Sequence, residues 1–173
     1  MVKRNLQNVL AAAVVEGLQY EKIGGYIYEL RELQKDGMEE RDIFIDRLYE
    51  VKNKQKTDFD LIQIDSEGVD APERQFAKLL DSREDVKLFM KLPAKFKIDT
   101  PVGNYNPDWA IIKQVDGNDR IYMIRETKST LDESKRRPIE NAKIRAAKKH
   151  FDAIGLGADS IDYAVGVPGN WNL

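Results

Sequence analysis

Three charged residues lie at the two ends of a predicted β-hairpin. Asp108, which follows Pro107, opens an apolar, β-rich run over residues 109–115, and Glu126-Thr127-Lys128 closes a second run over residues 121–127. A turn signature, Asp116-Gly117-Asn118-Asp119, separates the runs. Because the open ends of a hairpin lie side by side, we expect Asp108, Glu126 and Lys128 to meet at one edge of a sheet. Glu126 and Lys128 are two positions apart, so they project from the same face of their strand.

These residue types suit hydrolysis of a phosphodiester without a covalent intermediate. Two carboxylates, from Asp108 and Glu126, are hard oxygen ligands of the kind that Mg²⁺ takes, with water and substrate phosphate in its other positions. Such an ion lowers the pKa of bound water and neutralises developing charge. Lys128 can orient the attacking water or stabilise the transition state electrostatically. We therefore predict a catalytic set of Asp108, Glu126 and Lys128 with Mg²⁺, and expect Mn²⁺ to substitute.

A shared ion constrains the register of the hairpin. Two acids that share one ion lie on the same face, so we expect Asp108 and Glu126 to be directly opposed or one bulge away from direct opposition. Direct pairing requires an odd-numbered loop such as residues 116–118. A two-residue turn at Gly117-Asn118 without a bulge opposes Asp108 to Thr127 and turns the two acids to opposite faces. That register would contradict a shared ion.

Pro-Asp followed by Glu-x-Lys is a weak motif by itself, and an ordinary hairpin with a surface salt bridge is the simpler explanation of it. Three surrounding features favour a site: the motif occupies both ends of one hairpin, a helix with an acid near its start precedes it, and a cationic segment follows. Residues 135–149 hold seven Lys or Arg and one acid, Glu140, in a chain of 173 residues with a formal net charge of −2. Any contact with DNA is expected to need this segment.

Composition sets further bounds. The chain is 42% hydrophobic and 34% charged, as for a globular protein with a charged surface. It has no cysteine, which excludes disulfides, thiolate metal sites and cysteine nucleophiles. No apolar run reaches the length of a membrane span, and no signal-peptide cleavage pattern follows residues 9–15, so we expect a cytoplasmic protein without a membrane partner.

The order of predicted elements defines an α/β fold. We expect helices over residues 6–18 and 38–52, with a strand or irregular turn at 20–30 between them. A helix from Pro72 to Leu80 follows, then extended segments at 86–92 and 96–98, the hairpin with Trp109 and Tyr122 in its core, a helix over 138–151 and a last strand at 161–167. This gives an αβββαβ core with a mixed sheet flanked by helices. We place an N-terminal helical and linker region at residues 1–60 and the catalytic domain at 61–173.

Residues 71–151 resemble the PD-(D/E)xK nuclease superfamily and, within it, the C-terminal endonuclease domain of Type III restriction enzyme Res subunits. The Gly17–Ile23 segment also resembles the link between motor and nuclease in that family. Two departures occur: Ser129 stands where the family usually has Gly, and Ala146-Ala147 replaces Cys-Gly. The stretches that carry the resemblance are Glu73–Ala77, Asp81–Leu88, Lys91–Pro93, Phe96–Ile98, Thr100–Gly103, Tyr105–Ala110, Arg125–Lys128, Lys143–Arg145 and Lys148–Phe151.

The resemblance implies a restriction-endonuclease-like fold and cleavage of double-stranded DNA in a restriction-modification assembly. It implies two partners: a helicase-like ATPase region, in this or another chain, and a modification (methyltransferase) subunit. The chain has no Walker-type phosphate loop, so we expect a terminal fragment of such a subunit or a free-standing relative. The resemblance also makes Glu73 a third metal ligand, against the simpler interpretation of an acid that stabilises a helix N-terminus. Lys143, Lys148 and Lys149 are candidate phosphate contacts or, alternatively, a solvated face.

Two other functions stay open. A RecB-like exonuclease acts on DNA ends and cannot attack a covalently closed circle. A non-catalytic module that keeps the fold to bind DNA or a motor partner is the other alternative, and the complete set of Asp108, Glu126 and Lys128 argues against it.

Overall fold

The computed structural model describes residues 47–57, 59–94, 96–116, 119–154 and 161–173. The helix predicted over residues 6–18 and the segment at 20–30 lie outside these residues, as does most of the helix predicted over 38–52. None of the described helices is both long enough and apolar enough to cross a membrane.

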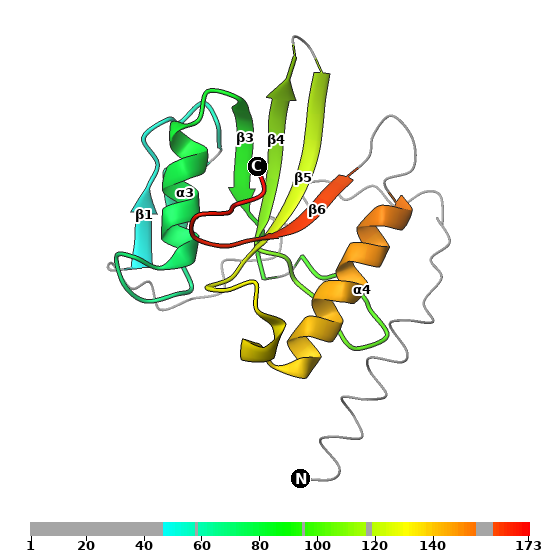
Figure 1. Ribbon diagram of the computed structural model, residues 1–173. Helices are drawn as coiled ribbons and strands as arrows, with labels where there is room; N and C mark the ends of the chain where they lie inside the picture. The colour runs from blue at the N-terminus through cyan, green and yellow to red at the C-terminus, as the bar shows by residue number, and fades with distance from the viewer. Residues whose placement is uncertain (1–46, 58, 95, 117–118, 155–160) are drawn as a thin grey trace.

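A four-stranded mixed sheet in the order β3-β4-β5-β6 forms the centre of the fold (Figure 1). Its strands are β3 (Val86–Lys91), β4 (Trp109–Val115), β5 (Asp119–Thr127) and β6 (Ile161–Gly166). β3, β4 and β5 pair antiparallel, whereas β6 is parallel to β5 because helix α4 (Pro138–Ile154) provides the crossover. With helix α3 (Pro72–Ser82) before β3, the order αβββαβ is confirmed.

The two helices pack on opposite faces of the sheet. Phe76, Ala77 and Leu80 of α3 pack with Phe89, Trp109, Ile111 and Met123, whereas Ile144, Ala147 and Phe151 of α4 pack with Ile124 and Tyr163. Met123 and Ile124 are adjacent on one strand, so the two clusters lie on its two faces. A helix therefore packs against each face of the sheet.

A small antiparallel ribbon of β1 (Leu48–Glu50) and β2 (Leu61–Gln63) lies beside α3. The helix predicted over residues 38–52 is wrong at its C-terminal end, because residues 48–50 form β1. Leu48 and Val51 fit a helical spacing, yet Tyr49 is the buried residue of β1 and its hydroxyl donates to the buried Asp81 (2.7 Å). Tyr49 and Val51 join the α3 cluster, so residues before position 60 contribute to the same core.

Two details of the hairpin also bear on the predictions. Trp109 is fully buried as expected, but Tyr122 is 41% exposed and is not a core residue. The segment predicted as extended at 96–98 forms only an isolated bridge, between Ile98 and Tyr105. Tyr122 lies on the α4 face of β5, near Leu88 and Ile112.

Candidate active site

The hairpin adopts the register that a shared ion requires. Val115 pairs with Asp119 and Trp109 with Arg125, which leaves the odd-numbered loop 116–118 and places Asp108 and Glu126 directly opposite each other one step beyond the last pair. The predicted register is confirmed. Lys128 follows β5 immediately, so all three predicted residues lie at one end of the hairpin.

Asp108 lies at the junction of β3, β4 and β5. Its carboxylate accepts hydrogen bonds from the backbone N–H and the hydroxyl of Thr127, both at 2.7 Å, and its carbonyl accepts from the Leu92 N–H (2.7 Å). Burial raises the pKa of Asp108, although Lys91 and Thr127 act to lower it. Asp108 also lines a cleft of about 310 Å³, so this residue borders a space that opens to solvent.

Glu126 is the more deeply buried acid, with 5% of its surface exposed. Its Oε2 accepts from the Tyr105 hydroxyl (2.5 Å), which also hydrogen-bonds to the Tyr163 hydroxyl (2.7 Å), and its Oε1 lies 2.8 Å from the Lys128 Nζ. Burial, with a smaller contribution from the charge of Asp108, raises the pKa of Glu126 to about 7. Without a bound cation, this carboxyl is therefore partly protonated near neutral pH.

Lys128 is shared between two acids from different elements. Its Nζ lies 2.8 Å from Glu126 and 2.8 Å from Glu140, which stands in the first turn of α4. Burial acts to lower the pKa of Lys128, but the two ion pairs outweigh it and raise the pKa. Lys128 is thus a permanent cation fixed beside Glu126, suited to stabilising negative charge and unsuited to acting as a base.

Glu73 faces the same region from the N-terminal turn of α3, but its oxygens are engaged. Oε1 pairs with Lys91 Nζ (2.7 Å), and Oε2 accepts from the backbone N–H groups of Asp65 (2.8 Å) and Ser66 (3.2 Å). In the part of the chain that the structure describes, no three acidic or imidazole side chains gather closely enough to enclose an ion. The role of Glu73 as a third ligand stays a prediction.

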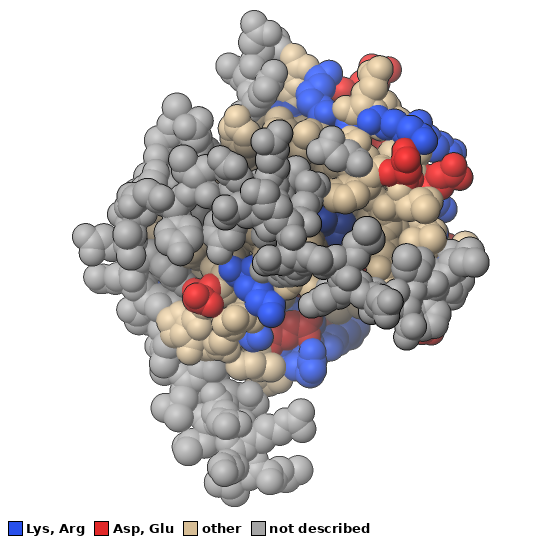
Figure 2. Space-filling model, turned by 180° about the vertical axis from the view of Figure 1, so that it is seen from behind, with Lys and Arg blue, Asp and Glu red and all other residues tan. Residues whose placement is uncertain are grey.

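The three predicted DNA-binding lysines do not form one free cationic face. Lys143 donates to the Asn104 carbonyl (2.8 Å), and Lys148 pairs with Asp152 (3.2 Å), whereas Lys149 is partly buried. Seen from behind, basic and acidic side chains of the described residues lie next to one another (Figure 2). Their contact with DNA stays a prediction.

Several residues of this site carry no sequence signal of their own. Tyr105, Tyr163, Glu140 and Lys91 come from four separate segments, and only tertiary structure brings them to Glu126, Lys128 and Glu73. Lys91 and Tyr105 stand within stretches that carry the family resemblance, and this was the only sequence signal that could have indicated their place in the site. Their contacts show that each acid of the site is held by a specific donor.

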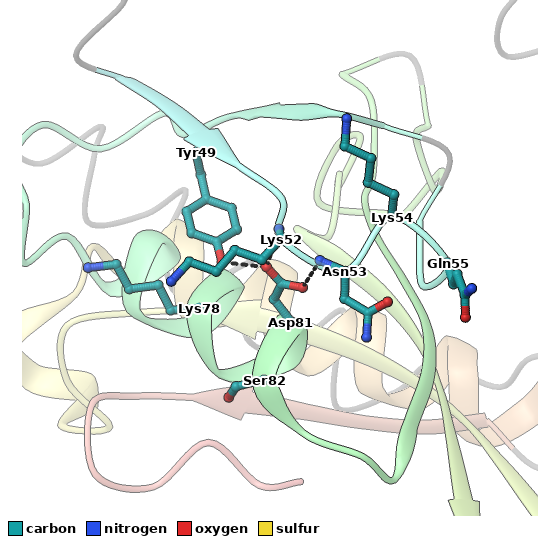
Figure 3. Close-up of a pocket in the computed structure, with 8 residues that line it drawn as sticks. All are labelled: Tyr49, Lys52, Asn53, Lys54, Gln55, Lys78, Asp81 and Ser82. Atoms are coloured by element: carbon teal, nitrogen blue, oxygen red, sulfur yellow. Dashed lines mark hydrogen bonds between the residues drawn. The ribbon is translucent and has the colours of Figure 1, made fainter.

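A larger pocket, of about 730 Å³, lies at the opposite end of α3 from Glu73 (Figure 3). At its base the Asp81 carboxylate accepts from the Tyr49 hydroxyl and from the N–H groups of Lys52 (2.8 Å) and Asn53 (2.9 Å). These bonds fasten the segment after β1 to the C-terminal end of α3. Asp81 is therefore a structural acid, and burial, which alone would raise its pKa, is outweighed by these donors, which lower it.

The αβββαβ sheet with a helix on each face, and with acids and a lysine at the strand ends, is a restriction-endonuclease-like core. Residues 55–169 match the model of a protein family described as an endonuclease domain, which is more than half of the chain. The chain belongs to this endonuclease domain family, and the match supports nuclease activity. No curated protein and no solved structure matched the chain.

Proposed function

We propose that the chain is a Mg²⁺-dependent endodeoxyribonuclease of the PD-(D/E)xK type, with Asp108, Glu126 and Lys128 at its catalytic centre. The observation that carries the proposal is the direct opposition of Asp108 and Glu126 at the open end of the hairpin, with Lys128 2.8 Å from Glu126. Family membership independently supports a nuclease.

The donor set fits a hard divalent cation. Removal from water raises the pKa of both carboxyl groups, and the charge of Asp108 adds to the rise at Glu126, so that without a cation these acids take up protons more readily. Mg²⁺ is commonly held by one or two carboxylates, with water and substrate phosphate as its remaining ligands, so two acids suffice. When bound, the ion would supply Lewis-acid activation of a phosphoryl oxygen and a more acidic water.

The residues of the chain itself have separable tasks. Asp108 lines the cleft and accepts a hydrogen bond from the Thr127 N–H, so its carboxylate would be the metal ligand on the cleft side. Glu126 would be the metal ligand on the buried side, with its carboxylate oriented by the Tyr105 hydroxyl. Lys128, held at its charge by Glu126 and Glu140, would stabilise negative charge that develops on the phosphate in the transition state.

We further propose that the chain is the cleavage module of a Type III-like restriction enzyme, acting on double-stranded DNA. In that setting a helicase-like ATPase region and a modification subunit would deliver it to its target. This finer assignment rests on the sequence resemblance over residues 71–151.

Nicking of covalently closed, supercoiled plasmid in Mg²⁺ or Mn²⁺ tests the proposed activity. Wild type should convert supercoiled plasmid to open circles, and Asp108→Asn, Glu126→Gln and Lys128→Met should each lose at least about a hundredfold in rate, as for loss of one transition-state group. Glu133→Gln is the matched control, because Glu133 is an exposed acid paired with Arg145 outside the site. This control should cut at the wild-type rate.

The same assay separates the alternatives. Degradation of linear DNA with closed circles untouched would refute an endonuclease and favour an exonuclease. DNA binding without any cleavage by the full chain in either metal would instead favour a non-catalytic module.

A further inference from the structure

Lys91, the last residue of β3, is a partly buried cation that the proposed mechanism does not use. Its Nζ lies 2.7 Å from Glu73 Oε1 and 2.8 Å from Asp65 Oδ2, and its side chain is only 13% exposed. The same ammonium group stands 5.7 Å from the centre of the Trp109 ring, within the range of a cation–π contact. Lys91 is thus fixed in place from three directions.

The position of Lys91 is defined by the acids of the candidate site. It lines the same cleft as Asp108 and Asp65, and its charge acts on Asp108. Glu73 offers one oxygen to Lys91, while backbone N–H groups occupy the other. One ammonium group therefore counterbalances three carboxylates, those of Asp65, Glu73 and Asp108.

We infer that Lys91 is a resident cation of the cleft, a positioning residue that holds Glu73, screens Asp108 and thereby lowers the affinity of the site for a divalent ion. This inference rests on the proposed metal-dependent function and adds a control of metal binding to it. The physical reason is twofold. The ammonium charge repels a second cation in the same cleft, and it engages the Glu73 oxygen that a metal would otherwise contact.

The expected effect follows from the strength of close charge interactions. A unit charge within about 4–6 Å changes the proton affinity of a carboxylate by roughly tenfold to a thousandfold. We take the lower value for a divalent ion in a cleft open to water. Removal of the Lys91 charge should therefore tighten metal binding by about tenfold or more.

Titration of the full-length chain with Mn²⁺, followed by electron paramagnetic resonance of the free ion, tests this without any activity measurement. Lys91→Met removes the charge. Lys91→Gln is the second variant in case the methionine variant does not fold, because the glutamine amide also lacks the charge but can still donate to Glu73. Lys113→Met is the matched control. Lys113 is another partly buried lysine of the sheet, 18% exposed and paired at 3.6 Å with Asp85, and it stands opposite Val86 at the far end of β3.

Tighter Mn²⁺ binding in a Lys91 variant, with Lys113→Met equal to wild type, supports the inference. Equal Mn²⁺ affinity in wild type and the Lys91 variants, with binding lost in Asp108→Asn, overturns it while the proposed metal site stands. Lower thermal stability of the Lys91 variants without a change in Mn²⁺ affinity also overturns it, because Lys91 is then only a structural ion pair. Absence of Mn²⁺ binding in all of these proteins, wild type included, overturns both the inference and the proposed function.

Discussion

Replacing Glu126 with Gln should raise the stability of the metal-free protein relative to wild type progressively as pH rises. Glu126 is 5% exposed, its Oε2 accepts from Tyr105 and its Oε1 pairs with Lys128. Glutamine has nearly the same shape, and its amide oxygen can still accept from Tyr105. Lys128 keeps its second partner, Glu140 (2.8 Å). The substitution therefore removes one buried, titratable charge with little change in packing.

The magnitude follows from the pKa of Glu126, which burial raises from 4.5 to about 7. A raised folded-state pKa means that the folded protein binds the proton more tightly than the unfolded chain. The associated stability is fully present below pH 4.5 and is lost as pH rises through 7. At 1.36 kcal/mol per unit the total is about 3 kcal/mol, of which about 2.5 kcal/mol falls between pH 5 and pH 8.

Urea unfolding of both proteins at pH 5, 6, 7 and 8, with EDTA present and followed by far-UV circular dichroism, measures this difference. The free energy of unfolding of Glu126→Gln relative to wild type should rise by about 2–3 kcal/mol from pH 5 to pH 8. Glu133→Gln, which changes an acid that is 59% exposed outside the site, is the control variant. Added Mn²⁺ should stabilise wild type and leave Glu126→Gln nearly unchanged.

A stability difference between Glu126→Gln and wild type that is the same at pH 5 and pH 8 would refute the reasoning. Glu126 would then titrate in the folded protein as it does in the unfolded chain. Its burial would not be shifting its protonation, and the argument that the paired acids attract a cation would lose its electrostatic basis.

Three further predictions follow from other contacts. Tyr105→Phe removes the hydroxyl that donates to Glu126, and this hydrogen bond acts to lower the pKa of Glu126. The acidic limb of the pH–rate profile for plasmid nicking should therefore move to higher pH. A limb at the same pH as in wild type would exclude this role of Tyr105. If α4 binds DNA, replacing both Lys143 and Lys148 with Met should weaken DNA binding by a similar factor on any DNA sequence. The slope of log affinity against log salt concentration should flatten by about 0.9 per lost phosphate contact. Unchanged affinity and slope in a fluorescence-anisotropy titration would show that these lysines form only a solvated face. Gly166→Ala should lower the free energy of unfolding by about 1–3 kcal/mol, because its Cβ would lie 3.1 Å from the Trp171 carbonyl oxygen; a urea midpoint equal to that of wild type would show that the C-terminal segment gives way freely.

The order of elements from α3 to β6 and the ends of the hairpin could be predicted from residue patterns along the chain. Apolar residues at helical spacing after Pro72 and in residues 138–151, and β-rich runs around one turn signature, are local signals that the sheet then reinforced. These features could be predicted because they depend on neighbours within a few residues along the chain. The register of the hairpin stayed open between a loop at 116–118 and a turn at Gly117-Asn118, and the pairing of the strands selects the first.

The β1–β2 ribbon and the exposure of Tyr122 depend on contacts between distant segments and could not be predicted from local patterns. Residues 48–51 fit both a helical and an extended pattern, and the extended form is selected by pairing with residues 61–63 and by the buried Asp81. Tyr122 reads as a core residue, yet it lies 41% exposed on the α4 face of β5. Both outcomes depend on which distant segment covers a given surface.

The state of the candidate site was likewise decided in three dimensions. Asp108, Glu126 and Lys128 were identifiable from their types and spacing, but the partners that set their charge were not. The charge of Lys91 acts on Asp108 from the end of β3, Tyr105 donates to Glu126 from the turn before β4, and Glu140 pairs with Lys128 from α4. The pKa of a buried acid depends on its removal from water and on charges within a few ångströms, and neither quantity is encoded by any local pattern of residues.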